Sequence, residues 1–131
     1  STRLELTLGE ALPRIDGNAA QLQQLVLNLV RNAFEALADQ PVDSREVRLT
    51  TRLREDGDIE LAVSDNGPGF PPEISARLFH PFATTKKSGT GLGLAISRTI
   101  TLHHGGMIGT RPAAPSGACV FITLPPRERP V

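Results

Sequence analysis

A run of glycines comes just before an apolar segment in "SGTGLGLAIS", residues 88–97. Gly89, Gly91 and Gly93 carry no Cβ atom, so their backbone amides can approach a ligand that a side chain would hold away. We expect a helix from about Leu92, and the first N–H groups of a helix have no partner inside it. These donors and the helix dipole favour an anion such as a phosphate chain. The glycines alone are equally consistent with a flexible turn that lets a helix start.

A second glycine cluster, "DNGPGF", follows an apolar segment that is typical of a strand. The carboxylate of Asp65 could accept a hydrogen bond from a ligand amine inside a cleft, where such a bond discriminates strongly between ligands. Gly67 and Gly69 would let the chain fold back, and Phe70 could supply an apolar wall. Taken by itself, Asp-Asn-Gly is more simply a tight turn.

Two asparagines stand one helical turn apart in a segment with helical spacing of leucines. At about 100° per residue, Asn28 and Asn32 lie on one flank of the apolar face. Asparagine is a mediocre helix former, so the pair has a propensity cost that another role should offset. Amide oxygens suit magnesium, which takes few protein ligands beside substrate phosphates. Standing alone, two solvated amides would be the simpler interpretation.

The composition excludes several other kinds of site. The 14 basic and 14 acidic side chains balance, so the net charge favours neither a nucleic-acid partner nor direct membrane contact. Cys119 is the one cysteine, which excludes an internal disulfide and is consistent with a reducing cytoplasm. The sequence has no P-loop and no dinucleotide-binding glycine pattern after a strand, so another nucleotide fold is needed. No apolar run approaches the roughly 20 residues that span a bilayer.

Periodicity predicts the elements that position these residues. Alternation predicts strands at 3–8, 47–54, 59–64, 107–111 and 119–124, the first half-buried through Leu4, Leu6 and Leu8. Asp56-Gly57 predicts a hairpin turn, and Gly105-Gly106 a helix end. Helices are predicted at about 19–38, with Asn18 and Gln21 as a capping box, at 72–79, and at 92–104. Residues 80–91 have no period and are predicted to form a loop.

Together these elements predict an α/β (α+β) two-layer sandwich. We expect a mixed, largely antiparallel sheet with helices on one face, in a single domain over residues 1–131 with a loose tail at 126–131.

The ordered motifs resemble the ATP-binding catalytic domain of sensor histidine kinases, within the superfamily of gyrase, heat-shock chaperones and mismatch-repair ATPases, which has the Bergerat-type fold. The similar stretches are "QLVLNLVRNAFEA" (N box), "DNGPGF" (G1 box), "LFHPFATTK" (F box) and "GTGLGL" (G2 box), together with "HHGGMI" and a closing Leu-Pro. Four boxes in the right order make the resemblance specific. The motifs "RNAFEA" and "PFATTK" are most similar to those of the nitrogen-regulation and oxygen-sensing kinases.

The resemblance implies a role for each box, with ATP and Mg as the bound groups. Asp65 would accept the adenine amino group, inside a pocket formed by Gly67, Gly69 and Phe70. Asn32, and with it Asn28, would hold magnesium or the phosphates. The remaining contacts would come from the lid and from the amides of the G2 box, namely Thr84, Thr85, Lys86, Lys87, Gly89, Thr90, Gly91, Leu92 and Gly93. Asn32 and Lys86 would be the catalytic residues.

Three positions depart from the family pattern. Asn18 stands where the family often has Asp, which is nearly equivalent as a cap. Glu35 stands where many members have a phosphate-contacting lysine. Ala118 follows Gly117 where the usual pair is Gly-Thr, which removes a hydroxyl near the adenine contact and predicts weak nucleotide affinity.

The resemblance also implies the partners. The chain would transfer the γ-phosphoryl group of ATP to a histidine on a separate dimerisation domain, and a response regulator would act through that domain. His80, His103 and His104 do not fit the acceptor pattern, so we expect the substrate histidine to lie outside this chain. We expect this chain to be a monomer, its parent a homodimer, and the setting cytoplasmic, with membrane anchoring of the parent left open.

Other functions stay open on the sequence alone. A related ATPase would need a water-activating glutamate where this chain has Asn28. An anti-sigma serine kinase, or a nucleotide-binding module that has lost phosphotransfer, would keep the same boxes.

Overall fold

The computed structural model describes residues 3–70 and 93–128. Its elements follow the chain as β1 (Arg3–Thr7), α1 (Ala19–Ala36), the 3-10 turn η1 (Val42–Ser44), β2 (Glu46–Leu53), β3 (Ile59–Asp65), α3 (Gly93–His103), β4 (Met107–Pro112) and β5 (Ala118–Leu124). The predicted helix at 72–79 and the loop at 80–91 lie outside the described residues.

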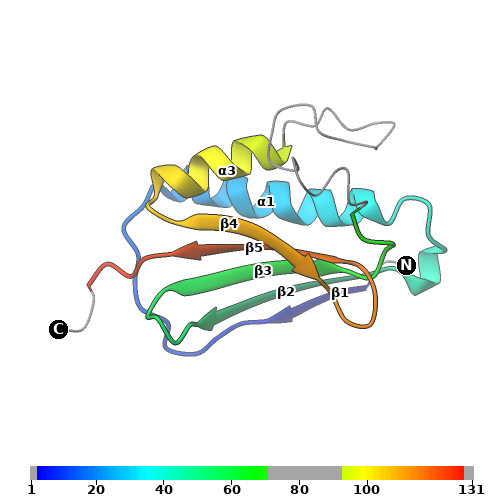
Figure 1. Ribbon diagram of the computed structural model, residues 1–131, viewed down its shortest axis with the longest axis horizontal. Helices are drawn as coiled ribbons and strands as arrows, with labels where there is room; N and C mark the ends of the chain where they lie inside the picture. Colours follow the sequence, from blue (N-terminus) through cyan, green and yellow to red (C-terminus); the bar gives the residue numbers. More distant parts are fainter. Residues whose placement is uncertain (1–2, 71–92, 129–131) are drawn as a thin grey trace.

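The five strands form one sheet in the order β1-β2-β3-β5-β4. β1 pairs with β2 in parallel, and the other neighbours are antiparallel. Both helices lie on the same side of this sheet, α1 over β2 and β3, and α3 over β4 and β5 (Figure 1). The predicted two-layer sandwich with a mixed, largely antiparallel sheet is confirmed.

The core lies between the helices and the inward face of the sheet. It is built from alternate residues of each central strand and from one stripe of each helix, as the periods of two and 3.6 residues require. Its buried members are Leu25, Leu29, Ala33 and Leu37 at α1, Val47 and Leu49 in β2, Val63 in β3, Leu94 and Ile100 in α3, and Val120, Ile122 and Leu124 in β5.

The start of α1 confirms half of the predicted capping box. The Asn18 side-chain oxygen accepts a hydrogen bond from the Gln21 N–H at 3.0 Å. The reciprocal bond differs from the prediction, because the backbone N–H of Asn18 donates to Nε2 of His104 at 3.0 Å. An imidazole at the end of α3 therefore completes the cap of α1.

The hairpin and the end of α3 form as predicted. Gly57 adopts a φ of 91° in the β2–β3 turn, and Gly105 a φ of 77° after α3. The N–H of Gly106 donates to the Thr101 carbonyl at 2.9 Å, so the glycine pair satisfies the last turn of the helix.

Two details of the prediction are wrong. β1 is a strand, but Leu4, Leu6 and Leu8 are about half exposed or more. The reason is that β1 is the edge strand, and no described helix covers the face on which its alternating leucines lie.

The tail is held at its beginning. Pro126 is buried, and Arg127 donates its backbone N–H to the Arg14 carbonyl at 2.6 Å.

Candidate functional site

Asp65 ends β3 and is 5% exposed. Its Oδ1 atom accepts hydrogen bonds from the backbone N–H of Gly67 at 2.9 Å and of Ala118 at 3.4 Å. One donor comes from the turn that follows the carboxylate, and the other comes from the neighbouring strand β5. Both of these donors are backbone amides, so the fold itself helps to orient the carboxylate.

Gly67 and Gly69 suit the turn after Asp65 for two different reasons. A Cβ at Gly67 would lie 3.1 Å from the Ala36 carbonyl oxygen and 3.3 Å from Cδ2 of Leu37, at the end of α1. Gly69 has a φ of 85°, a backbone conformation that residues with a side chain rarely adopt. The turn after β3 therefore folds against the last residues of α1, and Phe70 packs on the core behind it.

Asn66 has a structural role that the sequence reasoning missed. Its Oδ1 atom accepts from the Glu46 N–H at 2.9 Å, and its Nδ2 atom donates to the Ser44 carbonyl at 2.6 Å. These bonds tie the turn after β3 to the start of β2. The Asp-Asn-Gly turn signal indicated a loop here, but it could not indicate which distant backbone groups the amide would satisfy.

Asn28 and Asn32 lie on one flank of α1 and are partly buried, as the helical spacing predicted. The Nδ2 atom of Asn28 is fully buried and has no hydrogen-bond partner among the described residues. Such a group costs about 1–3 kcal/mol if it stays unsatisfied. The orphaned amide therefore indicates a position that suits a polar ligand.

Gly93 opens α3, and a Cβ built on it meets no described atom within 4 Å. Packing against the described residues therefore does not require a glycine at this position. The carbonyl of Gly93 accepts from the Ser97 hydroxyl at 2.8 Å, which holds the first turn. The other predicted residues of the lid and G2 box lie outside the described residues, namely Thr84, Thr85, Lys86, Lys87, Gly89, Thr90, Gly91 and Leu92.

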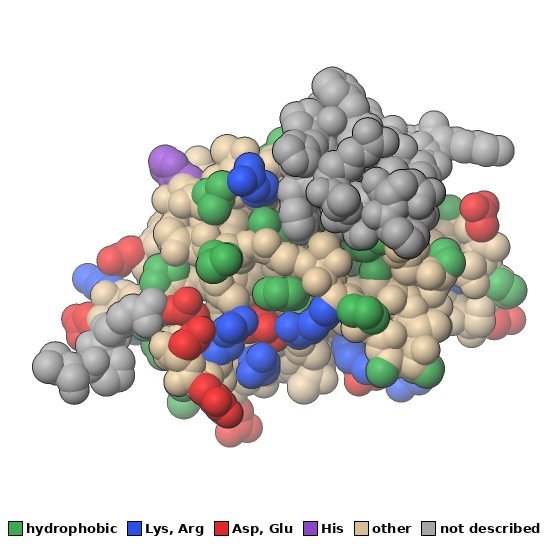
Figure 2. Space-filling model, viewed as in Figure 1, with side chains coloured by type: hydrophobic (Ala, Val, Ile, Leu, Met, Phe, Trp, Pro, Cys, Tyr) green, Lys and Arg blue, Asp and Glu red, His purple; other side chains and the backbone are tan. Residues whose placement is uncertain are grey.

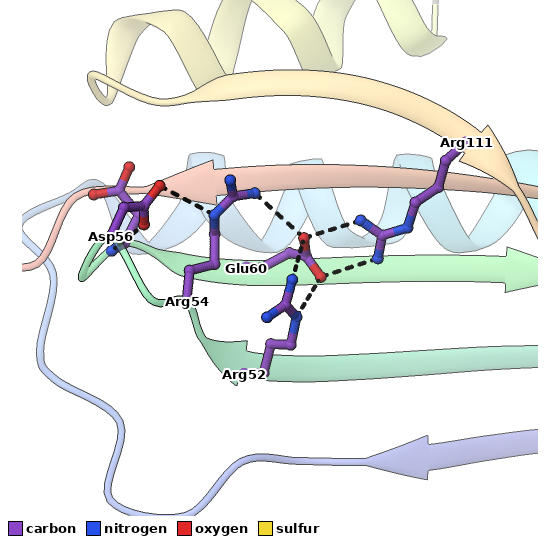
Figure 3. Close-up of polar contacts among 6 residues, drawn as sticks. Arg52, Arg54, Asp56, Glu60 and Arg111 are labelled. Carbon is purple, nitrogen blue, oxygen red and sulfur yellow. Dashed lines mark hydrogen bonds and ion pairs between the residues drawn. The ribbon is translucent and has the colours of Figure 1, made fainter.

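The opposite face of the sheet carries an ion cluster around Glu60, which is 1% exposed (Figure 3). Arg111 makes two hydrogen bonds to this carboxylate, both at 3.0 Å, and Arg52 and Arg54 approach it from β2 and its end. The Arg111 guanidinium also lies 4.7 Å above the ring of Phe121. Figure 2 shows this face, where basic and acidic side chains gather in mixed groups.

Hydrogen bonds from Arg111 hold the pKa of Glu60 at about 2, well below its usual 4.5, and Arg52 adds to this effect. Burial acts in the opposite direction and is outweighed. Sequence reasoning missed the cluster, since Arg111 reaches Glu60 from β4, which is distant in the sequence and lies on the other side of β5. The arrangement stabilises the face of the sheet that lies opposite the helices.

Within residues 3–70 and 93–128, His, Cys, Asp and Glu form no group of three or more that could hold a metal ion. No helix in that part of the chain has both the length and the apolar character to cross a membrane.

Known proteins match the chain over most of its length. A family model described as "Histidine kinase-, DNA gyrase B-, and HSP90-like ATPase" matches residues 17–128. The sensor histidine kinase TmoS of Ectopseudomonas mendocina is 40% identical over 93% of this chain, which spans 13% of that protein. The sensory histidine kinase/phosphatase NtrB of Rhizobium leguminosarum bv. phaseoli is 42% identical over 81% of this chain, which spans 30% of it. The chain thus corresponds to a minor part of each relative.

Solved structures agree with these relatives. The mycobacterial sensor histidine kinase MprB has a TM-score of 0.81 and 31% identity, over 98% of this chain and 84% of that one. Full-length ShkA in complex with AMPPNP has a TM-score of 0.79 and 28% identity, over 100% of this chain and 27% of that one. The chain therefore belongs to the histidine kinase-, DNA gyrase B- and HSP90-like ATPase family, as a catalytic domain of the sensor histidine kinase type.

Proposed function

We propose that this chain binds ATP with Mg²⁺ and delivers the γ-phosphoryl group to a histidine on a separate dimerisation domain. The observation that carries the proposal is the buried, unpartnered amide of Asn28 on the same flank of α1 as Asn32. A triphosphate with its metal would supply the polar partner that this amide lacks. The match of the family model to residues 17–128 and the AMPPNP in the ShkA structure support the choice of ligand.

Asp65 would hold the adenine. It is buried, and two backbone amides fix Oδ1, so the carboxylate is already oriented before a ligand arrives. A hydrogen bond from the adenine amino group to this carboxylate would select adenine over bases without that donor. Gly67, Gly69 and Phe70 would form the surrounding pocket. Ala118 supports Asp65 through its backbone N–H, although it lacks the hydroxyl that the family often has at this position.

The amides of Asn28 and Asn32 fit the phosphate end of the site. Each amide group offers an oxygen that suits Mg²⁺ and an NH₂ that suits a phosphate oxygen. Magnesium bound there would neutralise charge on the phosphates. Asn32 and Lys86 would act as the catalytic residues, and Thr84, Thr85, Lys87 and the G2 amides from Gly89 to Gly93 would complete the phosphate contacts. Phosphoryl transfer needs mainly positioning and charge stabilisation, so these groups are sufficient.

The acceptor histidine would come from another domain. His104 is committed to structure, since both ring nitrogens are engaged by backbone groups of Ile100 and Asn18. A response regulator would then receive the phosphoryl group through the dimerisation domain. We propose that the kinase domain acts in the cytoplasm and that the parent protein is a homodimer.

A competing function is ATP hydrolysis without a protein acceptor. It would need a base to activate water, and this chain has Asn28 where the related ATPases have a glutamate. An amide cannot accept a proton from water at neutral pH. We therefore expect negligible hydrolysis by this chain alone.

Phosphotransfer to an added dimerisation domain tests the proposal. The chain would be incubated with γ-labelled ATP, Mg²⁺ and a histidine-bearing dimerisation domain from a relative such as NtrB, with the acceptor histidine replaced by alanine as the control. We expect acid-labile, base-stable label on the domain with its histidine and none on the control. Acid-stable label on a serine, or rapid release of phosphate without the partner, would contradict the proposal and favour a serine kinase or an ATPase.

A further inference from the structure

His104 joins the end of α3 to the beginning of α1. Its Nδ1 atom lies 2.8 Å from the Ile100 carbonyl oxygen, within its own helix. Its Nε2 atom lies 3.0 Å from the backbone nitrogen of Asn18, the N-cap of α1. The two bonds together define one chemical form of the ring. A carbonyl can only accept and a backbone N–H can only donate, so Nδ1 carries the proton and Nε2 is an unprotonated acceptor.

Several residues lie close to the His104 ring. A Cβ at Gly17 would lie 2.7 Å from Cδ2 and 3.0 Å from Nε2 of His104, so a glycine is needed directly before the cap. A pocket of about 390 Å³ opens beside it, lined by Asp16, Gly17, Asn18, Gln21, His103 and His104. Asp16 is mostly exposed and pairs with Arg127 at 3.4 Å. The ring of His103 meets that of His104 edge-on at 5.9 Å.

Because the two helices pack along their lengths, this contact also affects how more distant parts of α1 and α3 lie relative to each other. α1 and α3 lie side by side and run in opposite directions (Figure 1). α3 has 11 residues, and counting back along it from His104 by that number reaches Gly93. The same count along α1 from Asn18 reaches Leu29, the neighbour of Asn28. Both paths rise about 16 Å at about 1.5 Å per residue. By this count Gly93 lies level with Leu29 along the helix axes, one residue from Asn28.

We propose that His104 is a positioning residue for the nucleotide site. Its neutral ring, protonated at Nδ1, fixes the axial position of α3 against α1. The glycine end of α3 is thereby set level with the asparagine flank of α1, where the phosphates would lie. This inference rests on the proposed nucleotide site for its effect on binding. The contact between the helices stands independently of it.

Three variants of the full chain test the effect on binding. His104→Leu removes the acceptor and keeps an apolar side chain, whereas His104→Gln can still accept from Asn18 and donate to Ile100. His103→Leu is the matched control, because His103 is the adjacent residue and its side chain makes no hydrogen bond among the described residues. Calorimetric titration with Mg-ADP well below the melting temperature should show about fivefold weaker binding for His104→Leu, the equivalent of one lost hydrogen bond.

Rescue by glutamine separates positioning from a merely structural role. We expect His104→Gln to bind within about twofold of the wild type and His103→Leu to bind like the wild type. Equal affinity in His104→Leu and the wild type, with both folded at the temperature of the titration, would overturn the inference.

The form of the ring can be measured in the wild type without any substitution. Nitrogen-15 NMR of the imidazole should show a protonated Nδ1 and an unprotonated Nε2 at alkaline pH. A proton on Nε2 would overturn the inference, because that nitrogen could not then accept from Asn18.

The positioning role of His104 can be tested even if the proposed function is wrong. If the wild type binds no nucleotide, the proposed function fails, and the inference is judged by the resonances of the Gly93 amide and the Asn28 side chain. Shifts at both positions in His104→Leu, but not in His103→Leu, would support the positioning role. Unchanged resonances in His104→Leu would overturn it.

Discussion

Gly117 and Asp65 lie so close that a side chain at position 117 would overlap the backbone carbonyl oxygen of Asp65. Gly117 also has a φ of 104°, in the region that favours glycine. This contact lets the next residue, Ala118, bring its N–H to Oδ1 of Asp65. The beginning of β5 therefore helps to hold the carboxylate that we propose as the adenine acceptor.

Replacing Gly117 by alanine should damage the domain. The methyl group would force β5 away from the end of β3, and the positive φ adds strain. We expect the free energy of unfolding to fall by about 2 kcal/mol or more, measured by urea denaturation. A loss below about 0.5 kcal/mol, the range of ordinary surface changes, would show that the backbone here adapts easily.

Gly93→Ala is the matched control for Gly117→Ala, because a Cβ at position 93 meets no described atom within 4 Å. Alanine is the better helix former, so the free energy of unfolding should stay the same or rise by up to about 1 kcal/mol. Nucleotide affinity should fall about tenfold if the phosphates approach this backbone closely. Calorimetric titration with Mg-ADP checks this effect. Unchanged affinity would mean that the ligand stays away from the start of α3.

Asn28→Leu should separate stability from binding. Leucine removes a buried NH₂ group that has no partner among the described residues, and it has the higher helix propensity. We expect the free energy of unfolding to rise by about 1 kcal/mol, while affinity for Mg-ADP falls about tenfold or more. Thermal melts and titrations on the same sample give both quantities. A less stable variant with full affinity would contradict the role assigned to this amide.

Glu60 should make the free energy of unfolding of the domain depend on pH in the acidic range. Its pKa in the folded state is about 2, below the 4.5 of the unfolded chain, so its contribution is complete above about pH 4.5 and is lost as the pH falls through about 2. The shift corresponds to a contribution on the order of 3 kcal/mol.

Urea denaturation between pH 6 and pH 2 measures this contribution. Glu60→Gln should be less stable than the wild type near neutral pH, and the difference should shrink toward pH 2. Glu46→Gln is the control, because Glu46 pairs with Arg48 at 2.8 Å on the same face but is more exposed. An equal pH profile in both variants would show that the ion cluster around Glu60 contributes little.

Local patterns predicted those parts of the fold that depend on local physics. The leucine spacing from Leu22 to Leu37 defined α1, since a buried stripe must recur every 3.6 residues. Asp56-Gly57 and Gly105-Gly106 defined a turn and a helix end because the backbone needs positive φ there. The ordered motifs placed Asp65 at the end of a strand and Asn28 on the flank of a helix, and both positions are confirmed.

Contacts between distant segments were not predictable in this way. The alternation of Leu4, Leu6 and Leu8 indicates one face of a strand, but whether a helix covers that face depends on the strand order. The pairing of Glu60 with Arg111 depends on β3 and β4 flanking β5. The bond between His104 and Asn18 likewise joins residues 86 positions apart, and no local signal indicates that the helix cap and the histidine meet.

Titration of the wild type and of Asp65→Asn with Mg-ADP tests the central claim most directly. The asparagine can still accept from Gly67 and Ala118 through its oxygen, but it replaces the second carboxylate oxygen with an NH₂ group that cannot accept from adenine. We predict that the wild type binds and that Asp65→Asn, with an unchanged melting curve, binds about tenfold to a hundredfold more weakly. Equal affinity in the two proteins would contradict the assignment of this cleft as a nucleotide site.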